Sequence, residues 1–446
     1  MSLTTEISTR QPANLTVAAL GARWLRNLAG SSLLKKSTLS VLDQGVVSGT
    51  SFATSVLLGR MVSQEELGVY YLALSVFYFA RGIQEQVVSA PYMIYCGRKQ
   101  GPELAQYAGS TLLHQCVVML ATAAALLIAL AAGALPSGIQ SAFWLLVVAA
   151  PLMLVREFAR QMSFAHLDIT RATLLDIAAS ILQVIALIIL AATGQLTIFT
   201  TLATLAIAAG LATIGWFATS RQGTIAQTGA AIRDWLHNWQ FARWALASQL
   251  LANTTPYIMP WVVAVTHGEA QTGMLGACTT LVGLSSTFLQ GVCNFLSPQA
   301  AQAYSRGGLA ELRSVLIKSA ILFSVGLGAF ALLGFLLGEQ IAVLLFGPQF
   351  AGAGIIIGVL SLSVLANSFG ATAGNGLWAM ERPRANFVAD LISLGVVILA
   401  TPILVPPFGP LGAAISTLLG TSTDASVRIW ILRKSMLELA ASGGSP

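Results

Sequence analysis

The chain has 446 residues, of which 56% are hydrophobic and only 9% are charged, and its mean hydropathy is +0.77. A soluble domain carries about 25% charged residues, so this composition excludes a soluble globular protein and predicts an all-α protein that crosses a membrane many times. The net charge of +6 is compatible with nucleic-acid binding, but a soluble nucleic-acid-binding protein could not bury so much apolar surface.

Residues 1–36 come first and contain no adequate signal peptide, because the apolar stretch VAALGA is too short. We expect a basic cytoplasmic segment at the membrane interface. Short connections join the apolar spans that follow, and we predict twelve of them: 38–60, 67–91, 107–133, 141–162, 172–193, 197–219, 243–265, 271–298, 316–338, 352–379, 386–404 and 409–432.

The basic residues orient these spans. With the N-terminus in the cytoplasm, every Lys and Arg except Arg60 and Arg81 falls on the cytoplasmic side. Because positive charge is retained inside the cell, both termini are predicted to be cytoplasmic.

The first span, LDQGVVSGTSFATSVLLGR (42–60), begins with Asp43 and ends with Arg60. As a helix, its charged ends would lie roughly 26 Å apart, close to the ~30 Å hydrocarbon thickness of a bilayer. Polar residues recur within it at steps of three and four, which predicts a polar stripe along one face made by Gln44, Ser48, Ser51 and Ser55. Such a face is expected to turn towards other helices or a water-filled interior.

The second span places Arg81 about 21 Å inwards from Leu67, where an arginine needs a partner or water. Glu85 lies four residues later, on the same helical face as Arg81. Two interpretations remain open: a structural pair in which Glu85 neutralises Arg81, or a cavity-lining Arg81 that binds a diphosphate. Tyr78 shares this face and could stack on sugars, whereas an aromatic belt accounts for Tyr70 and Tyr71.

Three other arginines are predicted substrate-binding residues. Arg156 and Arg160 repeat the four-residue spacing on the fourth span, and guanidinium groups bind phosphate oxygens in a bidentate fork. Snorkelling to the interface is the alternative for this pair. Arg60 is a weaker substrate-binding candidate, since an anchor at the membrane edge explains it as well.

Five acidic residues within or near the spans are ion-coupling candidates, because carboxylates in membranes serve as proton or sodium relays: Glu85, Asp43, Asp176, Asp390 and Asp424. Asp424 stands four residues before Arg428, so a salt bridge is the simpler explanation there.

Two further spans contain residues that bend or loosen helices, namely Pro256 and Pro260 in the seventh span and Gly370 and Gly374 in the tenth. They are hinge candidates for a conformational change, although packing without a gating role explains them equally. The four cysteines lack CxxC spacing, so no metal site is predicted.

The chain also repeats itself at an offset of 205 residues. Gln44 corresponds to Gln249, and Gly68 to Gly273. We predict two six-helix lobes, 37–219 and 243–434, joined by a cytoplasmic linker at 220–242 and followed by a tail at 435–446. The lobes would be related by a pseudo-two-fold axis along the membrane normal, an architecture suited to alternating access.

Three segments carry a family resemblance: LDQGVVSGTSFATSVLLGRMVSQEELGVYYLAL in the first two spans, VSAPYMI at the end of the second, and REFARQMSFA after the fourth. They resemble the Wzx-type polysaccharide flippases of the multidrug/oligosaccharidyl-lipid/polysaccharide (MOP) superfamily, over residues 38–434. This resemblance implies an O-antigen or exopolysaccharide flippase that moves undecaprenyl-diphosphate-linked oligosaccharide to the periplasmic leaflet of the bacterial inner membrane. Because lipid II flippases and cation-coupled multidrug exporters share the fold, a drug exporter stays the alternative.

Missing motifs narrow the mechanism. The sequence contains no P-loop and no HExxH motif, so we expect a transporter rather than an enzyme, without cofactor and driven by an ion gradient or the membrane potential. The outer connections, of which 339–351 is the longest, leave no room for the catalytic domain of a glycan polymerase or ligase, the enzymatic alternative. We expect a monomer that works with a polymerase and co-polymerase and binds no nucleic acid.

Overall fold

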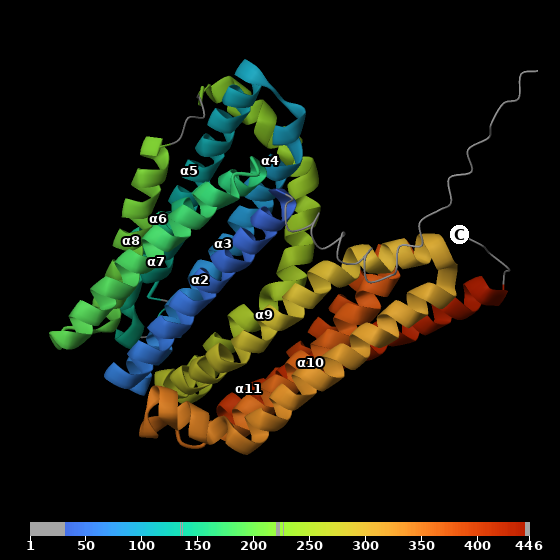
Figure 1. The fold of residues 1–446 in the computed structure, drawn as a ribbon. Helices are drawn as coiled ribbons and strands as arrows, with labels where there is room; N and C mark the ends of the chain where they lie inside the picture. Colours follow the sequence, from blue (N-terminus) through green and yellow to red (C-terminus); the bar gives the residue numbers. More distant parts are fainter. Residues whose placement is uncertain (1–31, 134, 136, 220–223, 226, 442–446) are drawn as a thin grey trace, which may run out of the picture.

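The computed structural model describes residues 32–133, 135, 137–219, 224–225 and 227–441, so most of the predicted interfacial segment 1–36 lies outside the described residues. All elements in this part of the chain are helical (Figure 1): α2 (Ser32–Met61), α3 (Gln64–Gln84), the π-helix η1 (Glu85–Ser89), α4 (Ala90–Tyr95), the 3-10 helix η2 (Cys96–Arg98), α5 (Gly101–Ala131), α6 (Ser137–Ala165), α7 (Ile169–Ala192), α8 (Ile198–Thr219), α9 (Thr228–Phe346), the 3-10 helix η3 (Pro348–Phe350), α10 (Ala353–Ala379) and α11 (Pro383–Ala441).

Glycines interrupt the two longest helices. In α9 the backbone leaves the helical region at Gly268 and Gly308, with φ of 81° and 59°, and in α11 at Gly409, with φ of 54°. Glycine adopts such positive φ values without the steric penalty of a side chain. Helix α9 therefore consists of three helical parts (228–267, 269–307 and 309–346) and α11 of two (383–408 and 410–441).

Seven of the described helices are long and apolar enough to cross a membrane, with α9 and α11 each counted once. The chain is thus a multi-pass membrane protein, as its composition predicts. Helices α2 and α3 fall outside these seven and carry polar and charged residues, including Asp43 and Arg81, which need burial against other helices.

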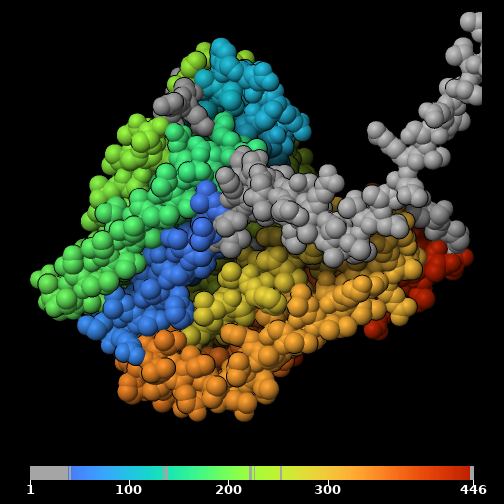
Figure 2. Space-filling model, in the orientation of Figure 1, coloured from blue at the N-terminus to red at the C-terminus, as the bar shows by residue number. Residues whose placement is uncertain are grey.

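The helices form two groups that meet at one end and diverge from it (Figure 1). Helices α2 to α8 make up the first group, and α10, α11 and the later parts of α9 the second. Figure 2 shows α2, in blue, at the surface between α7 and the yellow part of α9, both of which it contacts. The end where the groups meet contains residues 59–71, 268–276 and 344–350.

Close backbone contact seals this end. A Cβ atom built on Gly68 of α3 would lie 1.9 Å from the backbone oxygen of Glu269, and one built on Gly273 of α9 would lie 2.2 Å from the backbone oxygen of Gln64. Only glycine permits two helices to approach this closely. The two glycines are equivalent positions of the predicted repeat.

The predicted linker 220–242 is helical from Thr228 onwards, where the first part of α9 begins. Tyr107 of α5 donates a hydrogen bond from its hydroxyl to Oδ1 of Asn238 (3.0 Å), and Nε2 of His114 lies 2.8 Å from the backbone oxygen of Ala231. The first part of α9 is thereby fixed to α5 before it enters the second group.

Candidate functional site

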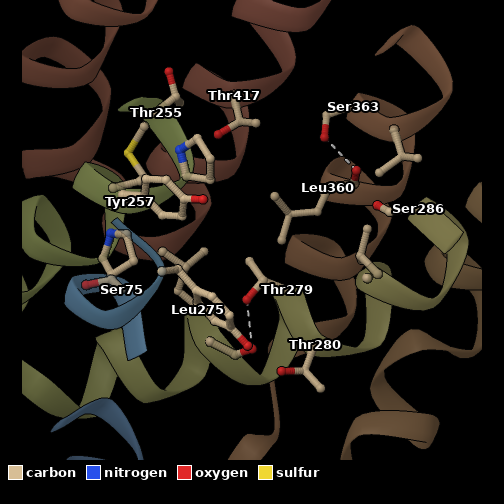
Figure 3. A pocket seen from close by; sticks show the side chains of 18 of the residues that line it. Ser75, Thr255, Tyr257, Leu275, Thr279, Thr280, Ser286, Leu360, Ser363 and Thr417 are labelled. Carbon is tan, nitrogen blue, oxygen red and sulfur yellow. Dashed lines mark hydrogen bonds between the residues drawn. The ribbon is translucent and has the colours of Figure 1, made fainter. Parts of the chain in front are cut away.

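A cavity of about 960 Å³ lies between the two groups of helices, lined by α2, α3, α9, α10 and α11 (Figure 3). The polar stripe predicted on the first span is part of its wall, since all four of its members line the cavity: Gln44, Ser48, Ser51 and Ser55. The prediction that this face turns towards other helices or a water-filled interior is confirmed.

Four charged residues line the cavity, and they come from both groups: Arg81 of α3, and Asp390, Asp424 and Arg428 of α11. Arg81 therefore lies where the cavity-lining interpretation predicts it. Its side chain keeps 32% of its surface exposed, and its Nη2 lies 3.1 Å from Oε1 of Glu157. Because one side of this guanidinium faces the cavity, it can accept a second anionic partner.

The predicted pairing of Arg81 with Glu85 is wrong for this structure. The ion pair that Arg81 makes runs to Glu157 on α6, and no ion pair with Glu85 is found among the described residues. The regular α-helix ends just before Glu85, where the π-helix η1 begins. The backbone N–H of Glu85 still bonds to the oxygen of Arg81, so the two residues keep the four-residue spacing. The Arg81 side chain nevertheless pairs with Glu157 of α6.

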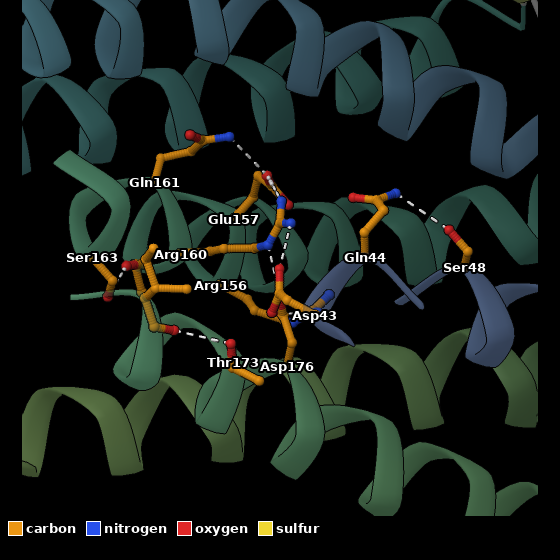
Figure 4. A network of polar contacts seen from close by, with 12 residues as sticks. Asp43, Gln44, Ser48, Arg156, Glu157, Arg160, Gln161, Ser163, Thr173 and Asp176 are labelled. Atoms are coloured by element: carbon orange, nitrogen blue, oxygen red, sulfur yellow. Dashed lines mark hydrogen bonds and ion pairs between the residues drawn. The ribbon is translucent and has the colours of Figure 1, made fainter. Parts of the chain in front are cut away.

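Arg156 and Arg160 do not line the cavity but belong to a buried ionic cluster beside it (Figure 4). Arg160 contacts Asp43 of α2 (Nη2 to Oδ2, 2.9 Å) and Asp176 of α7 (Nε to Oδ2, 2.6 Å), and Arg156 pairs with Asp176 as well. Neither arginine snorkels, because buried carboxylates on two neighbouring helices neutralise them. Their binding to a diphosphate stays a prediction.

The buried cluster continues to the cavity. Nη1 of Arg160 lies 3.3 Å from Oε1 of Glu157, the same atom that pairs with Arg81. Three arginines and three carboxylates are thus linked, and their formal charges balance. Removing a fully buried member of this set, such as Asp43 or Asp176, typically costs about 3–5 kcal/mol, because it leaves a partner unpaired. Asp43 and Asp176, but not Glu85, belong to this network.

The second charged group of the cavity wall is centred on Arg428. Its Nε lies 2.9 Å from Oδ1 of Asp424 and its Nη2 lies 2.5 Å from Oδ1 of Asp390. The predicted salt bridge between Asp424 and Arg428 is confirmed. Arg428 was not predicted as a cavity residue, because its position near the cytoplasmic end of the last span and a pairing four residues apart explained it locally.

The glycines of α10 make room for this group. A Cβ atom on Gly370 would lie 2.6 Å from Oδ2 of Asp424, and one on Gly374 would lie 2.5 Å from Nη1 of Arg428. Helix α10 runs without interruption through both positions. Close packing against α11 accounts for these two glycines, and their predicted hinge role stays a prediction.

Pro256 and Pro260 line the cavity from the first part of α9. The backbone of α9 leaves the helical region at the two glycines described above and not at these prolines. Their role as hinges likewise stays a prediction.

Arg60 lies away from the cavity, at the closed end. Its Nε donates a hydrogen bond to the backbone oxygen of Leu345 (2.8 Å), and its guanidinium also bonds the backbone oxygen of Leu344. Both oxygens belong to the last turn of α9, where a cation is favoured by the helix dipole. This placement agrees with the anchor interpretation rather than with substrate binding.

Three tyrosines of α3 lie on the cavity wall, which differs in part from the prediction made from the sequence. Tyr70 and Tyr71 line the cavity together with Tyr78, so the expectation that they belong to an aromatic belt is wrong. The Tyr71 hydroxyl lies 2.8 Å from Oγ1 of Thr280, a contact between α3 and the second part of α9.

Comparisons with known structures identify this arrangement. The chain is similar to a multidrug resistance MATE family transporter of the MOP superfamily in its inward-facing conformation, with a TM-score of 0.72 and 14% sequence identity over 89% of this chain and 96% of that one. It is also similar to the lipid II flippase MurJ in an inward closed conformation, with a TM-score of 0.73 and 14% identity over 92% of this chain and 90% of that one. The chain has the MOP superfamily fold. The resemblance predicted from the sequence is confirmed at this level.

Sequence comparison reaches less far. No family model matches the chain. A probable low-salt glycan biosynthesis flippase, Agl15 of Haloferax volcanii, is 24% identical over 173 residues, which is 38% of this chain and 36% of that protein. The aligned part thus spans about a third of Agl15, which is named for glycan biosynthesis.

Proposed function

We propose that this protein is a flippase that moves undecaprenyl-diphosphate-linked oligosaccharide from the cytoplasmic to the periplasmic leaflet of the bacterial inner membrane, in the biosynthesis of a surface polysaccharide. The observation that carries the proposal is a cavity between two groups of helices with an arginine on each side, Arg81 and Arg428. The similarity to MurJ and to Agl15, both named as flippases, supports it.

The architecture supports transport by alternating access. If the breaks at Gly268, Gly308 and Gly409 are counted as helix ends, and α3, η1 and α4 as one span, the described helices are compatible with the two lobes of six that we propose, the first part of α9 being counted with the second lobe. Gly68 and Gly273, equivalent in the repeat, contact each other across the closed end, which supports a pseudo-two-fold axis passing near them. The open end lies on the side of the basic connections, which the positive-inside rule assigns to the cytoplasm.

The charges suggest how a diphosphate is accepted. Both arginines are paired with carboxylates, Arg81 with Glu157 and Arg428 with Asp390 and Asp424. A diphosphate carries more negative charge and fits the guanidinium fork, so it displaces a carboxylate without leaving a bare cation. The displaced Glu157 then offers a site for a proton or cation, which links cargo binding to an ion gradient.

Reconstituted vesicles provide the test. The purified protein is expected to transfer a fluorescent lipid diphosphate-linked oligosaccharide between leaflets. Arg81→Gln should abolish this transfer while leaving expression and insertion intact, and Arg81→Lys should keep part of it, because the charge survives and the fork is lost. An inactive Arg81→Gln that regains full transfer when Glu157→Gln is added would show that the pair is structural, and would contradict the proposal.

A cation-coupled multidrug exporter is the second candidate function. The apolar and aromatic part of the cavity wall, which includes Phe52, Tyr70 and Leu360, favours it, because drug sites are mostly apolar with few polar groups. Expression in a drug-sensitive host distinguishes the two candidates. Resistance to cationic drugs without movement of the lipid diphosphate would select the exporter.

A further inference from the structure

Outside its four charged residues, the cavity wall is neutral and rich in hydroxyl groups. Figure 3 shows a part of it in which no labelled residue is charged, and we call the polar side chains of this part the hydroxyl wall: Ser75, Thr255, Tyr257, Thr279, Thr280, Ser286, Ser363 and Thr417. These residues come from α3, the first two parts of α9, α10 and α11. The two Arg and two Asp of the cavity carry no net formal charge, so the cavity as a whole is electrically balanced.

Several of these hydroxyl groups already donate their hydrogen to a backbone oxygen of the protein. Oγ1 of Thr279 donates to the backbone oxygen of Gly276 (2.8 Å), Oγ of Ser363 to that of Leu360 (2.6 Å), and Oγ1 of Thr417 to that of Ala413 (2.9 Å). The same is true of other cavity residues, namely Thr272, Ser393 and Thr421. A hydroxyl has one hydrogen and two lone pairs, so these groups turn acceptor sites towards the cavity.

Amide donors are sparse among the described residues of the wall, which include Gln44 and Asn367 as the side-chain amides. Nε2 of Gln44 is bonded to Oγ of Ser48 at 3.2 Å. An ionised carboxylate is acceptor-only, and it would face other acceptors at Thr279, Ser363 and Thr417. A sugar hydroxyl or acetamido N–H is a donor and fits the same positions.

We propose that the hydroxyl wall is a glycan-binding site selective for neutral sugars, and that the cargo carries no carboxylate or phosphate on its sugar residues. This inference rests on the proposed function, since it concerns the glycan part of the lipid-linked cargo. The diphosphate meets Arg81 and Arg428, which provide the two cationic side chains of the described wall. An acidic sugar would have to give up its hydration without gaining a cation or enough donors in return.

The aromatic residues of the cavity complete the site. Tyr71 is held by its hydroxyl contact to Thr280, and Tyr257 makes an edge-to-face ring contact with Phe79 (centroids 6.3 Å apart). Rings fixed in this way offer flat apolar faces beside polar groups, which suits the mixed apolar and hydroxylated faces of neutral pyranoses.

Binding to the full-length protein in lipid nanodiscs tests the proposal. Three probes are compared by titration: farnesyl diphosphate, the same lipid carrying a neutral N-acetylglucosamine trisaccharide, and the same lipid carrying a galacturonic acid trisaccharide. We expect the neutral conjugate to bind at least tenfold more tightly than the acidic one. Equal affinities, or tighter binding of the acidic conjugate, would overturn the proposal.

Variants then reverse the selectivity. Thr279→Lys and, independently, Ser363→Lys place a cation in the hydroxyl wall and should tighten binding of the acidic conjugate by about tenfold or more, each variant serving as a check on the other's folding. Thr193→Lys adds the same charge outside the cavity and should change nothing. If neither cavity variant, once shown to fold, gains affinity for the acidic conjugate, the assigned wall is wrong.

The probe without sugar separates this proposal from the proposed function. Binding of farnesyl diphosphate that is lost in Arg81→Gln supports the diphosphate site whatever the sugars do. If the diphosphate site holds and the neutral preference is absent, only the glycan inference fails. If farnesyl diphosphate binds equally well to Arg81→Gln, the proposed function fails first.

Discussion

Replacing Gly68 by alanine should open the closed end of the protein. The added Cβ would lie 1.9 Å from the backbone oxygen of Glu269, 1.5 Å short of ordinary van der Waals contact at 3.4 Å. This contact is to backbone, which cannot rotate away, so the two helices must separate. Overpacking of this kind costs about 1–3 kcal/mol, which corresponds to a shift of roughly five- to 150-fold in the ratio of closed to open forms.

The shift can be measured as the distance between spin labels at Met61 and Leu344, two exposed positions at that end. Pulsed electron paramagnetic resonance gives this distance in a protein without the four native cysteines. The Gly68→Ala population should move to longer distances. Gly45→Ala is the matched control, because a Cβ there meets nothing within 4 Å. An unchanged distribution in a folded Gly68→Ala protein, or an equal shift in Gly45→Ala, would refute the argument.

Three further predictions concern topology, energy and the buried cluster. Cysteines placed within 134–140 should react with an impermeant thiol reagent from outside the cell, whereas one at 307 should not; the reverse labelling would invert the assigned orientation. Transport should proceed without ATP and stop when ion gradients and the membrane potential are collapsed, so full transport under collapse would remove the coupling role of the carboxylates. Asp176→Asn should lower the free energy of unfolding by about 3–5 kcal/mol, because it leaves Arg156 and Arg160 short of a buried anion. Chemical denaturation measures this change, and a much smaller loss would show that the pairing does not stabilise the fold.

Periodicity predicted the features that depend on one helix alone. The polar stripe of α2 was predictable because side chains three and four residues apart share a face, and the stripe lines the cavity as expected. The bond between Asp424 and Arg428 follows from the same rule. The MOP fold was recognised from short segments rather than from any physical calculation.

Contacts between distant helices were not predictable in this way. Glu157 reaches Arg81 across 76 positions of sequence, and nothing in the spacing of either residue indicates that α3 and α6 lie side by side there. The local rule even selected the wrong partner, since it considers only residues of the same helix, whereas Arg81 pairs with Glu157 of another helix. Arg428 was misjudged for a related reason, because one local partner concealed its second contact with Asp390.

Helix α2 is attached to both groups of helices, to the first through Asp43 and to the second through Arg60. Near its start Asp43 is 1% exposed and holds Arg160 of the first group, and at its end Arg60 holds backbone oxygens of α9. If the two groups of helices rotate apart in the proposed alternating access, one attachment must release. An exposed hydrogen bond exchanges readily with water and costs about 1.5–3 kcal/mol even with a charged donor, less than the 3–5 kcal/mol of a buried ionic partner. Release is therefore expected to begin at Arg60, so that α2 would move with the first group and its Arg60 end would set how far the closed end opens.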